Sequence, residues 1–473
     1  MNYKGIIFFL GVYSFFISFF SFINILYSIY FNFVLDLYSY IITLLVSLFT
    51  GFLFYFIGRK HYKNISLSDQ IAFIIISFVL MPALISIPYI LSIYSIGFLD
   101  AYFESVSGIT TTGFSILNNV NNIDQPLILW RSSSQWLGGL FFLIATIGTI
   151  GSKQIKIKPA YLTSGGSSGR DFYTNFGTNF FKILLIYFAS TIVIIFAYTI
   201  IDIRLLDSFN LAFTVISSGG FLPTNDLSNI LSNDLQIFIL SLTFLLPILN
   251  FYLLFNIITK QFSLKNNQED LHIVLIIIFL TLFLYFFILS EEGIIRVLLA
   301  VTSSISTSGI AIYSSNFEIP LFFILMTIIG GSIISTSSGF KYIRIYILLK
   351  ISYNEIYRLA KPINIFNKNL FNTESTITDD DSKIAFLVFI SFIISIFILS
   401  SILTFDNLSF ENAFKLSILT LTNTVTSSLY GLDNLSFFDL NSFTKVSLII
   451  FMLIGRIEIV AVLFLIKKII FKE

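Results

Sequence analysis

The chain alternates long apolar runs with short polar turns, and one order of segments returns four times. Two apolar runs come first, at 6–30 and 34–57. Each later round contains a long apolar run, a short amphipathic segment, a polar turn and a second long apolar run. Apolar runs of about 18 residues or more are typical of helices that cross a bilayer. The pattern predicts an all-α polytopic membrane protein with ten full spans and four half-helices.

The four rounds divide the chain into units of unequal length. We expect two extra N-terminal helices in 1–63, followed by repeats in 64–165, 166–265, 266–370 and 371–473. The paired spans of these repeats are expected at 70–95 and 127–150, at 180–202 and 234–259, at 271–290 and from about 318, and at 384–404 and 440–467. Only the membrane parts repeat, so the connections between them differ in length.

The short amphipathic segments begin at a constant distance from the polar turns. Four residues hold the same place in the four turns, namely Gly113, Gly220, Gly309 and Val425. Thirteen positions earlier stand the residues that open the short segments, namely Asp100, Asp207, Arg296 and Asn412. A helix of 13 residues is about 20 Å long, enough to enter a membrane but not to cross it. The matching spacing predicts four half-helices, each followed by a polar turn.

The polar turns have the composition of an ion filter. Irregular backbone at membrane depth is tolerated only where protein or a water-filled cavity surrounds it, because lipid cannot satisfy its polar groups. A turn rich in Thr, Ser and Gly can aim carbonyl and hydroxyl oxygens at one point, where they replace the water shell of a cation. The candidate filter residues are Thr110, Thr111, Thr112 and Gly113; Ser217, Ser218, Gly219 and Gly220; Ser306, Thr307, Ser308 and Gly309; and Thr422, Asn423, Thr424 and Val425.

The half-helices are expected to attract cations. The C-terminal end of a helix carries about half a negative charge, and four such ends would point to the middle of the membrane. Three acidic residues, Asp100, Glu104 and Asp207, are expected to add negative potential near the entrance. For Asp100 and Asp207, capping of a helix start is an equally good interpretation.

Composition agrees with an integral membrane protein and excludes several kinds of site. Of the 473 residues, 56% are hydrophobic and 11% are charged, compared with about 25% charged residues in soluble domains. The chain has no Cys, and its two His, His61 and His272, lie far apart. Disulfides, thiolate or histidine metal sites and a catalytic triad are therefore excluded, and we expect no bound cofactor.

The placement of positive charge predicts the orientation. Of the 27 Lys and Arg, 21 lie on the side shared by both termini and by the connections between repeats. Five lie on the side of the four turns, namely Arg131, Arg204, Arg296, Lys415 and Lys445, and Arg456 lies within a span. By the positive-inside rule, both termini are cytoplasmic and the turns face outward.

Four segments together resemble the Trk/Ktr/HKT superfamily of potassium transporters. Residues 104–114, Glu-Ser-Val-Ser-Gly-Ile-Thr-Thr-Thr-Gly-Phe, are similar to the first filter of that family, and 131–139, Arg-Ser-Ser-Ser-Gln-Trp-Leu-Gly-Gly, to the start of the next helix. Residues 330–341 resemble the small-residue break in the second helix of the third repeat, and Gly-Arg-Ile-Glu at 455–458 resembles the Gly-Arg-Leu-Glu of the last helix. The two extra N-terminal helices favour the TrkH-type membrane subunit over the Ktr branch.

The resemblance implies one pore through a single subunit, with four non-identical repeats around a pseudo-fourfold axis. It implies potassium ions at the filter positions and potassium uptake across the bacterial cytoplasmic (inner) membrane, with Rb⁺ or Na⁺ as possible further ions. The implied partners are the lipid bilayer, a second copy in a homodimer and a cytoplasmic nucleotide-binding (TrkA-like) regulatory subunit that forms a ring. No nucleic acid is implied.

The fourth turn departs from the family pattern. Members of the family usually have a Gly-Pro-Gly-like sequence there, whereas this chain has Thr424-Val425-Thr426. A β-branched residue disfavours a positive φ, so this quarter of the filter is expected to be wider or differently oriented. A second registration would take Gly431 as the displaced filter glycine. The alternative function is a less selective Na⁺/K⁺ or Na⁺ transporter of the same fold.

The small-residue break is predicted to be a gate beneath the filter. Glycine in a helix costs roughly 1 kcal/mol relative to alanine, and a polar loop in mid-membrane needs a cavity around it. The candidate gate residues are Gly330, Gly331, Ser335, Thr336, Ser337, Ser338 and Gly339. The alternative is a kinked helix that packs closely through its small residues.

Arg456 is the other candidate gate residue, because a charge at membrane depth is expensive and usually faces a cavity or a partner. It can donate hydrogen bonds to carbonyls of the 330–340 loop and repel K⁺, which would make it an electrostatic latch. An ion pair with Glu458 is the alternative, but residues two apart on a helix do not face each other.

A polytopic membrane enzyme is the distant alternative. It would need paired carboxylates or a His/Asp constellation on the loops, and the sequence shows neither. We therefore predict a transporter or channel-like protein and not an enzyme.

Overall fold

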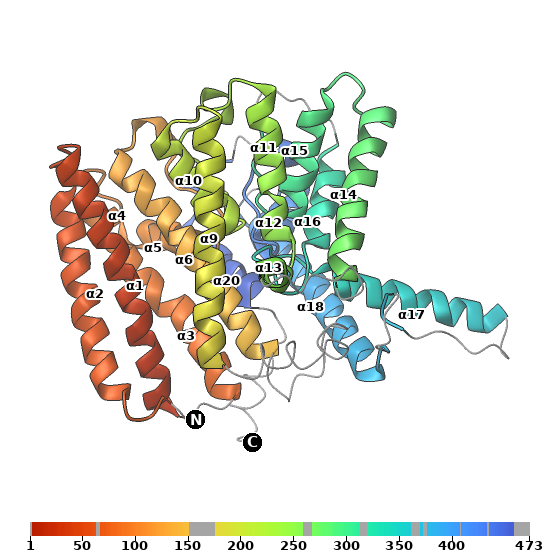
Figure 1. Cartoon of the computed structure of the whole chain (residues 1–473), viewed down its shortest axis with the longest axis horizontal. Coiled ribbons are helices and arrows are strands. Elements are labelled where there is room, and N and C mark those ends of the chain that lie inside the picture. Colours follow the sequence, from red (N-terminus) through yellow and green to blue (C-terminus); the bar gives the residue numbers. More distant parts are fainter. Residues whose placement is uncertain are drawn as a thin grey trace.

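The computed structural model describes residues 2–62, 67–150, 176–258, 267–312, 319–360, 369–371, 376–406, 408–432 and 435–457. Within these residues the regular structure is helical, apart from one isolated β-bridge between Asn369 and Thr376. Most of the long helices stand side by side and form a bundle (Figure 1). The predicted all-α fold is confirmed for the described part of the chain.

The helices follow one another in the order that the hydrophobic pattern predicts. They are α1 (Tyr3–Tyr30), α2 (Leu37–Gly58), α3 (Leu67–Ile85), α4 (Ile87–Leu91), α5 (Phe98–Ile109), α6 (Gln125–Ile150), α9 (Phe176–Ile200), α10 (Leu205–Ile216), α11 (Asp234–Thr243), α12 (Leu245–Ile248), α13 (Phe251–Ile258), α14 (Gln268–Phe287), α15 (Ile294–Ile305), α16 (Pro320–Ile329), α17 (Tyr342–Ala360), α18 (Asp379–Thr404), α19 (Phe410–Leu421) and α20 (Ser442–Ile457).

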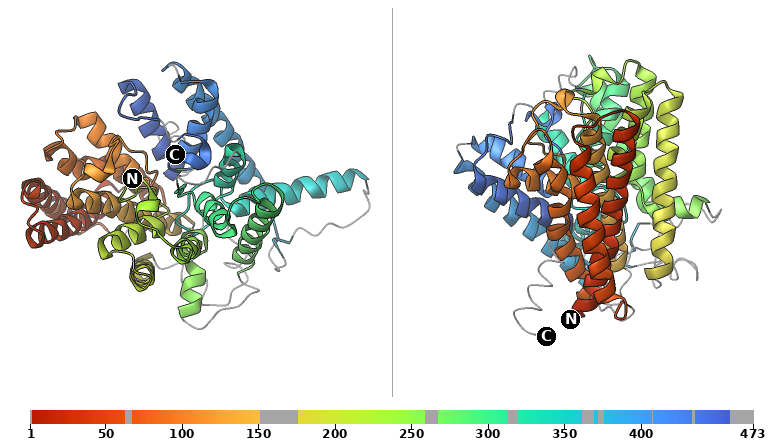
Figure 2. Two further views of the ribbon diagram at one scale, coloured as in Figure 1. Left: turned by 90° about the horizontal axis from the view of Figure 1, so that it is seen from above. Right: turned by 90° about the vertical axis from the view of Figure 1, so that its left-hand side faces the viewer.

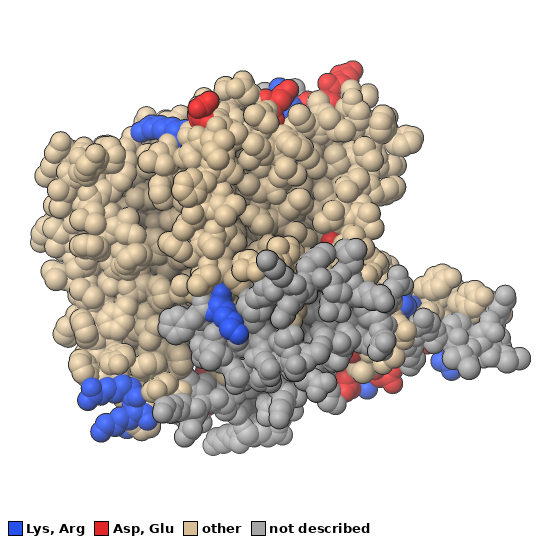
Figure 3. Space-filling view, viewed as in Figure 1, with Lys and Arg blue, Asp and Glu red and all other residues tan. Residues whose placement is uncertain are grey.

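Several helices are long and apolar enough to cross a membrane. Among the described residues these are α1, α2, the stretch Ser68–Leu91, the stretch Lys182–Ile200, α14 and α18, and a bent pair made of α11–α12 and α13 is a seventh candidate. Charged side chains gather toward the two ends of the bundle, and a wide band without charge lies between them on the face shown in Figure 3. The chain is therefore a multi-pass membrane protein, while the count of ten spans stays a prediction.

Four helices have the same length of 12 residues, namely α5, α10, α15 and α19. Twelve residues span about 18 Å, so these are the half-helices that the spacing predicts. Each begins two residues before its predicted start and ends four residues before the key position of its turn. At three of the four helices a residue suited to a helix start stands just before it. Gly97 precedes α5 and Gly293 precedes α15, while Ser409 accepts a hydrogen bond from the backbone N–H of Asn412 at the start of α19.

The extra N-terminal pair packs tightly against one side of the bundle (Figures 1 and 2). α1 contacts α2 along its length and also contacts α3 and α6. Glycine makes the contact between α1 and α2 possible, because a β-carbon on Gly58 would lie 2.5 Å from the carbonyl oxygen of Lys4. The Ser21 hydroxyl donates to the carbonyl of Tyr40 at 2.6 Å.

One span that the sequence predicts as continuous is broken, and another is not. The run predicted at 70–95 forms one stretch, Ser68–Leu91, in which Ser86 keeps helical backbone between α3 and α4. The prediction of one helix over 234–259 is wrong, since α12 ends at Ile248 and α13 leaves at an angle of 102°. Leu249, between them, has extended backbone with φ −75° and ψ 159°.

The break expected at 330–340 is present between α16 and α17. α16 ends at Gly330, whose φ is +63°, and α17 begins at Tyr342. α17 then runs outward from the bundle (Figures 1 and 2). The continuation of α20 to 467, the partner Glu458 and most of the connection between α6 and α9 lie outside the described residues.

Candidate ion filter and gate

The four 12-residue helices end in one backbone motif. After α5, the N–H of Thr111 donates to the carbonyl of Gly108 at 2.9 Å, and that of Thr112 to the carbonyl of Ser107 at 2.9 Å. The corresponding pairs close α10, α15 and α19, at 2.8–3.3 Å. This is a Schellman ending, in which the residue after the cap is left-handed. The left-handed residues are Thr111 (φ +59°), Ser218 (+58°), Thr307 (+61°) and Asn423 (+49°).

The motif aims carbonyl oxygens away from each helix. In a trans peptide the C=O and N–H groups point in opposite directions. Because the N–H groups of Thr111 and Thr112 point back into α5, the carbonyls of Thr110 and Thr111 point away from it. The same holds for the residues at these places in the other three turns. Each turn therefore presents two carbonyl oxygens that are not used by its own helix.

The four turns meet at their key positions. An ideal β-carbon on Gly113 would lie 2.7 Å from the Cα of Gly220, and one on Gly220 would lie 2.4 Å from the Cβ of Val425. One on Gly309 would lie 2.9 Å from the carbonyl oxygen of Val425. The side chain of Asn423 also donates to the Thr112 hydroxyl at 2.9 Å. The structure thus brings all four sequence-predicted turns to one place.

Val425 occupies the position of the three glycines, which excludes the registration with Gly431. Gly431 has φ +65° but follows the turn, and a β-carbon there would have no neighbour closer than 3.6 Å. The expectation that Val425 distorts the fourth turn, because a β-branched residue disfavours a positive φ, is also wrong. Gly113 and Gly309 have positive φ, at +86° and +72°, whereas neither Val425 nor Gly220 does. Val425 therefore fits its backbone, and its side chain is the unusual feature.

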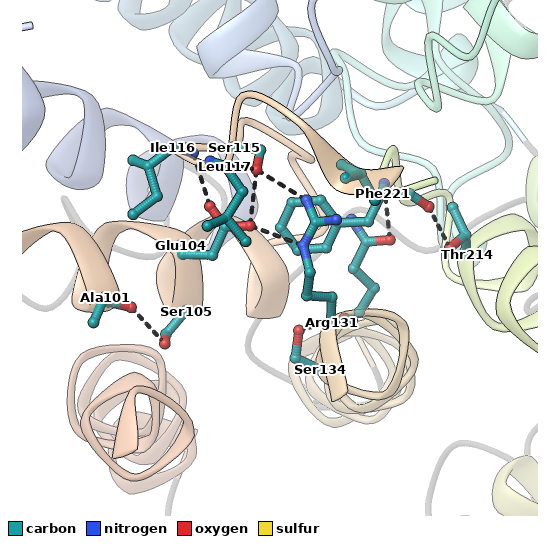
Figure 4. Close-up of polar contacts among 12 residues, drawn as sticks. Ala101, Glu104, Ser105, Ser115, Ile116, Leu117, Arg131, Ser134, Thr214 and Phe221 are labelled. Atoms are coloured by element: carbon teal, nitrogen blue, oxygen red, sulfur yellow. Dashed lines mark hydrogen bonds and ion pairs between the residues drawn. The ribbon is translucent and has the colours of Figure 1, made fainter. Parts of the chain in front are cut away.

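A buried ion pair supports the first turn from behind (Figure 4). Arg131 Nε lies 3.0 Å from Glu104 Oε1, and the side chains are 2% and 0% exposed. Glu104 also accepts from the Ser115 hydroxyl at 3.0 Å and from the N–H of Ile116 at 2.9 Å. The Arg131 guanidinium lies 4.2 Å from the ring centroid of Phe221, which follows the second turn. This cluster holds together the residues that follow the first and the second turn.

The expectation that Glu104 and Asp100 add negative potential at the entrance is wrong. Glu104 is fully buried and paired with Arg131. Asp100 forms an ion pair with Lys445 at 2.6 Å. The charges of both carboxylates are compensated by the protein itself, so Asp207 and the four helix ends remain as the expected sources of negative potential.

The loop 330–340 is attached directly to the helix ends beneath the turns. The Thr336 hydroxyl donates to the carbonyl of Ile216, the last residue of α10, at 2.8 Å. The N–H of Ser338 donates to the Thr307 hydroxyl, just after α15, at 2.9 Å. Thr336 and Ser338 are both buried. The loop therefore lies against two of the four negative helix ends.

Arg456 contacts this loop as its sequence position suggests. Its Nη1 lies 3.1 Å from the carbonyl oxygen of Thr336 and 2.6 Å from the Ser338 hydroxyl. The guanidinium carbon lies 4.0 Å from the ring centroid of Phe142, and the residue is 1% exposed. The geometry of the predicted latch is present.

Lys341 is a second cation in the loop that the sequence reasoning missed. Its ammonium lies 3.3 Å from the carbonyl oxygens of Ser332 and Ser335 and 3.1 Å from the Ser335 hydroxyl, and it also donates to the carbonyl of Ser337. Lys341 is 1% exposed. Lys341 directly follows the small-residue break, and this position is the signal that could have identified it. The charge count instead included it among the 21 Lys and Arg on the cytoplasmic side.

The break between α12 and α13 was also missed, and it pairs with the loop. The N–H of Ser332 donates to the carbonyl of Ile248, and that of Phe251 to the carbonyl of Ile334, both at 2.9 Å. The N–H of Ser337 donates to the carbonyl of Pro247 at 3.3 Å. Two irregular segments thus satisfy part of each other's backbone inside the bundle, where no lipid group can do so.

Comparison with known proteins gives distant relatives that match over most of their length. No family model matches the chain. It is 26% identical over 441 residues to an uncharacterized cation transporter of Methanocaldococcus jannaschii, covering 87% of this chain and 84% of the relative. It is 24% identical to the Trk system potassium uptake protein TrkH of Vibrio parahaemolyticus (89% and 90% covered) and 25% identical to TrkG of Escherichia coli (89% and 91%).

The fold matches a solved structure of the same group. The crystal structure of the potassium transporter TrkH from Vibrio parahaemolyticus superposes with a TM-score of 0.85 at 21% identity, covering 98% of both chains. The resemblance to TrkH-type members of the Trk/Ktr/HKT superfamily is thus confirmed in sequence and in fold. These relatives are named as transporters and not as enzymes.

The buried ion pair leads to a test of stability. Replacement Arg131→Ala leaves the Glu104 carboxylate buried without its partner, which typically destabilises a protein by about 3–5 kcal/mol. We expect a clear loss of stability in unfolding experiments on the purified protein in detergent. The exposed pair of Arg296 with Glu292, at 3.7 Å, is the matched control, and Arg296→Ala should change stability by less than about 1 kcal/mol. Equal effects of the two replacements would contradict the supporting role of Glu104.

Proposed function

We propose that this protein takes up potassium ions through a filter formed by the turns 110–113, 217–220, 306–309 and 422–425. The observation that carries the proposal is the meeting of four turns, each preceded by a 12-residue helix with the same ending. Four non-identical units around one axis are the simplest account of this arrangement. The relatives named as potassium uptake proteins support the choice of ion.

The helix ends and the carbonyls act together on a cation. Each helix contributes about half a negative charge at its C-terminal end, and four ends face one region. The carbonyl oxygens turned away from the helices replace water molecules around a dehydrated ion. Potassium is the substrate that binds at these positions, and the filter needs no bound cofactor.

The setting of the pore follows from the charge pattern and the resemblance. The positive-inside distribution puts both termini in the cytoplasm and the turns on the outside of a bacterial inner membrane. Ten spans, a homodimer and a cytoplasmic nucleotide-binding regulatory subunit complete the proposed assembly. α17 continues directly from the loop and runs out of the bundle (Figure 2), so it offers a route from such a partner to the gate.

A less selective Na⁺/K⁺ transporter is the second candidate, and Val425 favours it. The isopropyl group lies where a β-carbon of Gly220 would stand, with 2.4 Å between the two carbon positions. The side chain of Val425 therefore packs against Gly220 between the second and fourth turns, where the other three turns have glycine at the same position. An asymmetric set of carbonyls discriminates less sharply between ions of different size.

The loop 330–340 acts as the gate beneath this filter. It contacts the ends of α10 and α15 and holds two cationic side chains, Arg456 and Lys341, against its own carbonyls. A potassium ion leaving the filter would meet both positive charges. In this position the loop blocks the path sterically and electrostatically.

The proposed function is tested by growth of a potassium-uptake-deficient bacterium at low K⁺, with Rb⁺ and Na⁺ fluxes measured alongside. The wild-type chain should restore growth. Gly113→Ala should not, because its φ is +86° and the new β-carbon would lie 2.7 Å from the Cα of Gly220. Gly431→Ala is the matched control, with a similar φ but no close neighbour, and should restore growth. A wild-type chain that reaches the membrane but carries only Na⁺ would favour the second candidate.

The selectivity role of Val425 gives a separate prediction. Val425→Gly removes the group between the second and fourth turns, so we expect the K⁺/Na⁺ flux ratio in proteoliposomes to rise several-fold. Thr426→Gly adds the same backbone freedom one residue later and should leave the ratio near that of the wild type. A ratio unchanged by Val425→Gly would show that this side chain does not set selectivity.

The latch gives a prediction on basal flux. Arg456→Ala removes two hydrogen bonds to the loop and one positive charge below the filter, so Rb⁺ uptake into proteoliposomes should rise several-fold. Arg456→Lys keeps the charge but not the planar fork of donors, and an intermediate flux is expected. Wild-type flux in Arg456→Ala, at equal protein in the vesicles, would rule out the latch.

A further inference from the structure

Two adjacent carboxylates lie buried at the start of α14, beside both broken segments. Glu269 is 2% exposed and Asp270 is 3% exposed. Neither forms an ion pair with a side chain in the described part of the chain, and Glu269 Oε2 has no hydrogen-bond partner. Ionisable groups buried in a membrane protein are expensive, and they commonly mark functional positions.

Each carboxylate holds one of the two breaks. Glu269 Oε1 accepts a hydrogen bond from the N–H of Ile333, inside the 330–340 loop, at 3.0 Å. Asp270 Oδ1 accepts one from the N–H of Asn250, between α12 and α13, at 2.9 Å. Since the two residues are neighbours on one helix turn, they hold the loop and the other break at a fixed separation.

The break held by Asp270 is itself a helix start. The Asn250 side chain accepts from the N–H of Tyr252 at 2.9 Å, which is the geometry of an N-cap for α13. The N–H of Phe251, the first residue of α13, donates to Ile334 in the loop. A shift of α13 would therefore pull on the loop and on Asp270 together, and a shift of the loop would act on α13 in the same way.

We propose that Glu269 and Asp270 are positioning residues that hold the gate loop closed by coupling it to the break between α12 and α13. This rests on the proposed gate function of the loop. In the described part of the chain, the hydrogen bonds of the two carboxylates are accepted from the backbone N–H groups of Ile333 and Asn250 and from no filter residue. Opening requires the loop to leave Glu269, or to move with α13 and α14 as one unit.

The test compares alanine with the isosteric amide at each position, in proteoliposomes loaded for Rb⁺ and Na⁺ uptake. Glu269→Ala and Asp270→Ala remove the acceptor and should raise basal Rb⁺ flux several-fold. Glu269→Gln and Asp270→Asn keep an acceptor oxygen and should return the flux close to that of the wild type. The Rb⁺/Na⁺ ratio should not change in any variant, because the four turns are untouched.

A cysteine pair provides a measurement that does not depend on these variants. The chain has no native Cys, so Ile248→Cys with Ser332→Cys can be crosslinked without side reactions. These residues are joined by a backbone hydrogen bond of 2.9 Å. Oxidation should lower the flux below that of the wild type, and reduction should restore it.

The outcomes separate this proposal from the proposed function. If the wild-type protein carries no cation, the proposed function fails. If it conducts and Glu269→Ala does not exceed it, or if Glu269→Gln opens it as far as alanine does, the positioning role is overturned. Where an alanine variant does not fold, a crosslinked pair that conducts as freely as its reduced form overturns the proposal equally.

Discussion

The need to satisfy backbone polar groups inside a membrane governs the centre of this protein. Lipid offers no hydrogen bonds, so every irregular segment must find partners within the protein. The four turns do so by folding their N–H groups back onto their own helices. The loop 330–340 and the break at 249–250 do so by pairing with each other. In the proposed filter, conduction depends on the carbonyl oxygens of the turns that these hydrogen bonds leave unused.

In the proposed gate, side-chain cations take the place of a transported ion. Lys341 and Arg456 donate to carbonyls and hydroxyls of the loop, which are the oxygen types that coordinate potassium. Negative helix ends that favour a cation in transit also favour these two fixed charges. A fixed charge cannot leave, so the same electrostatics that draw an ion in also stabilise the closed loop. Opening therefore requires the protein to withdraw its own cations.

Local patterns predicted the four turns and the helices before them, whereas long-range contacts could not be predicted. The 12-residue helices, the shared register of Val425 with the three glycines and the break before Lys341 all follow from spacing and residue type along the chain. The bonds of Glu269 to Ile333 and of Asp270 to Asn250 join segments far apart in sequence, and no periodicity reveals them. The backbone of Val425 was misjudged because this position does not require a positive φ, as Gly220 at the same place in the second turn also shows.

The left-handed residues connect the four turns to the 330–340 loop. Glycine is the usual residue at such a helix ending, and a β-branched residue there is strained. Three of the four positions nevertheless use their side chains for contacts with other segments. Ser218 lies 3.2 Å from the Thr336 hydroxyl, Thr307 accepts from the N–H of Ser338, and Asn423 donates to Thr112 and to the carbonyl of Met452. At these three positions the side chain makes contacts that glycine cannot make. Two of the contacts reach the 330–340 loop, so a movement of the loop would change the support of the turns at Ser218 and Thr307.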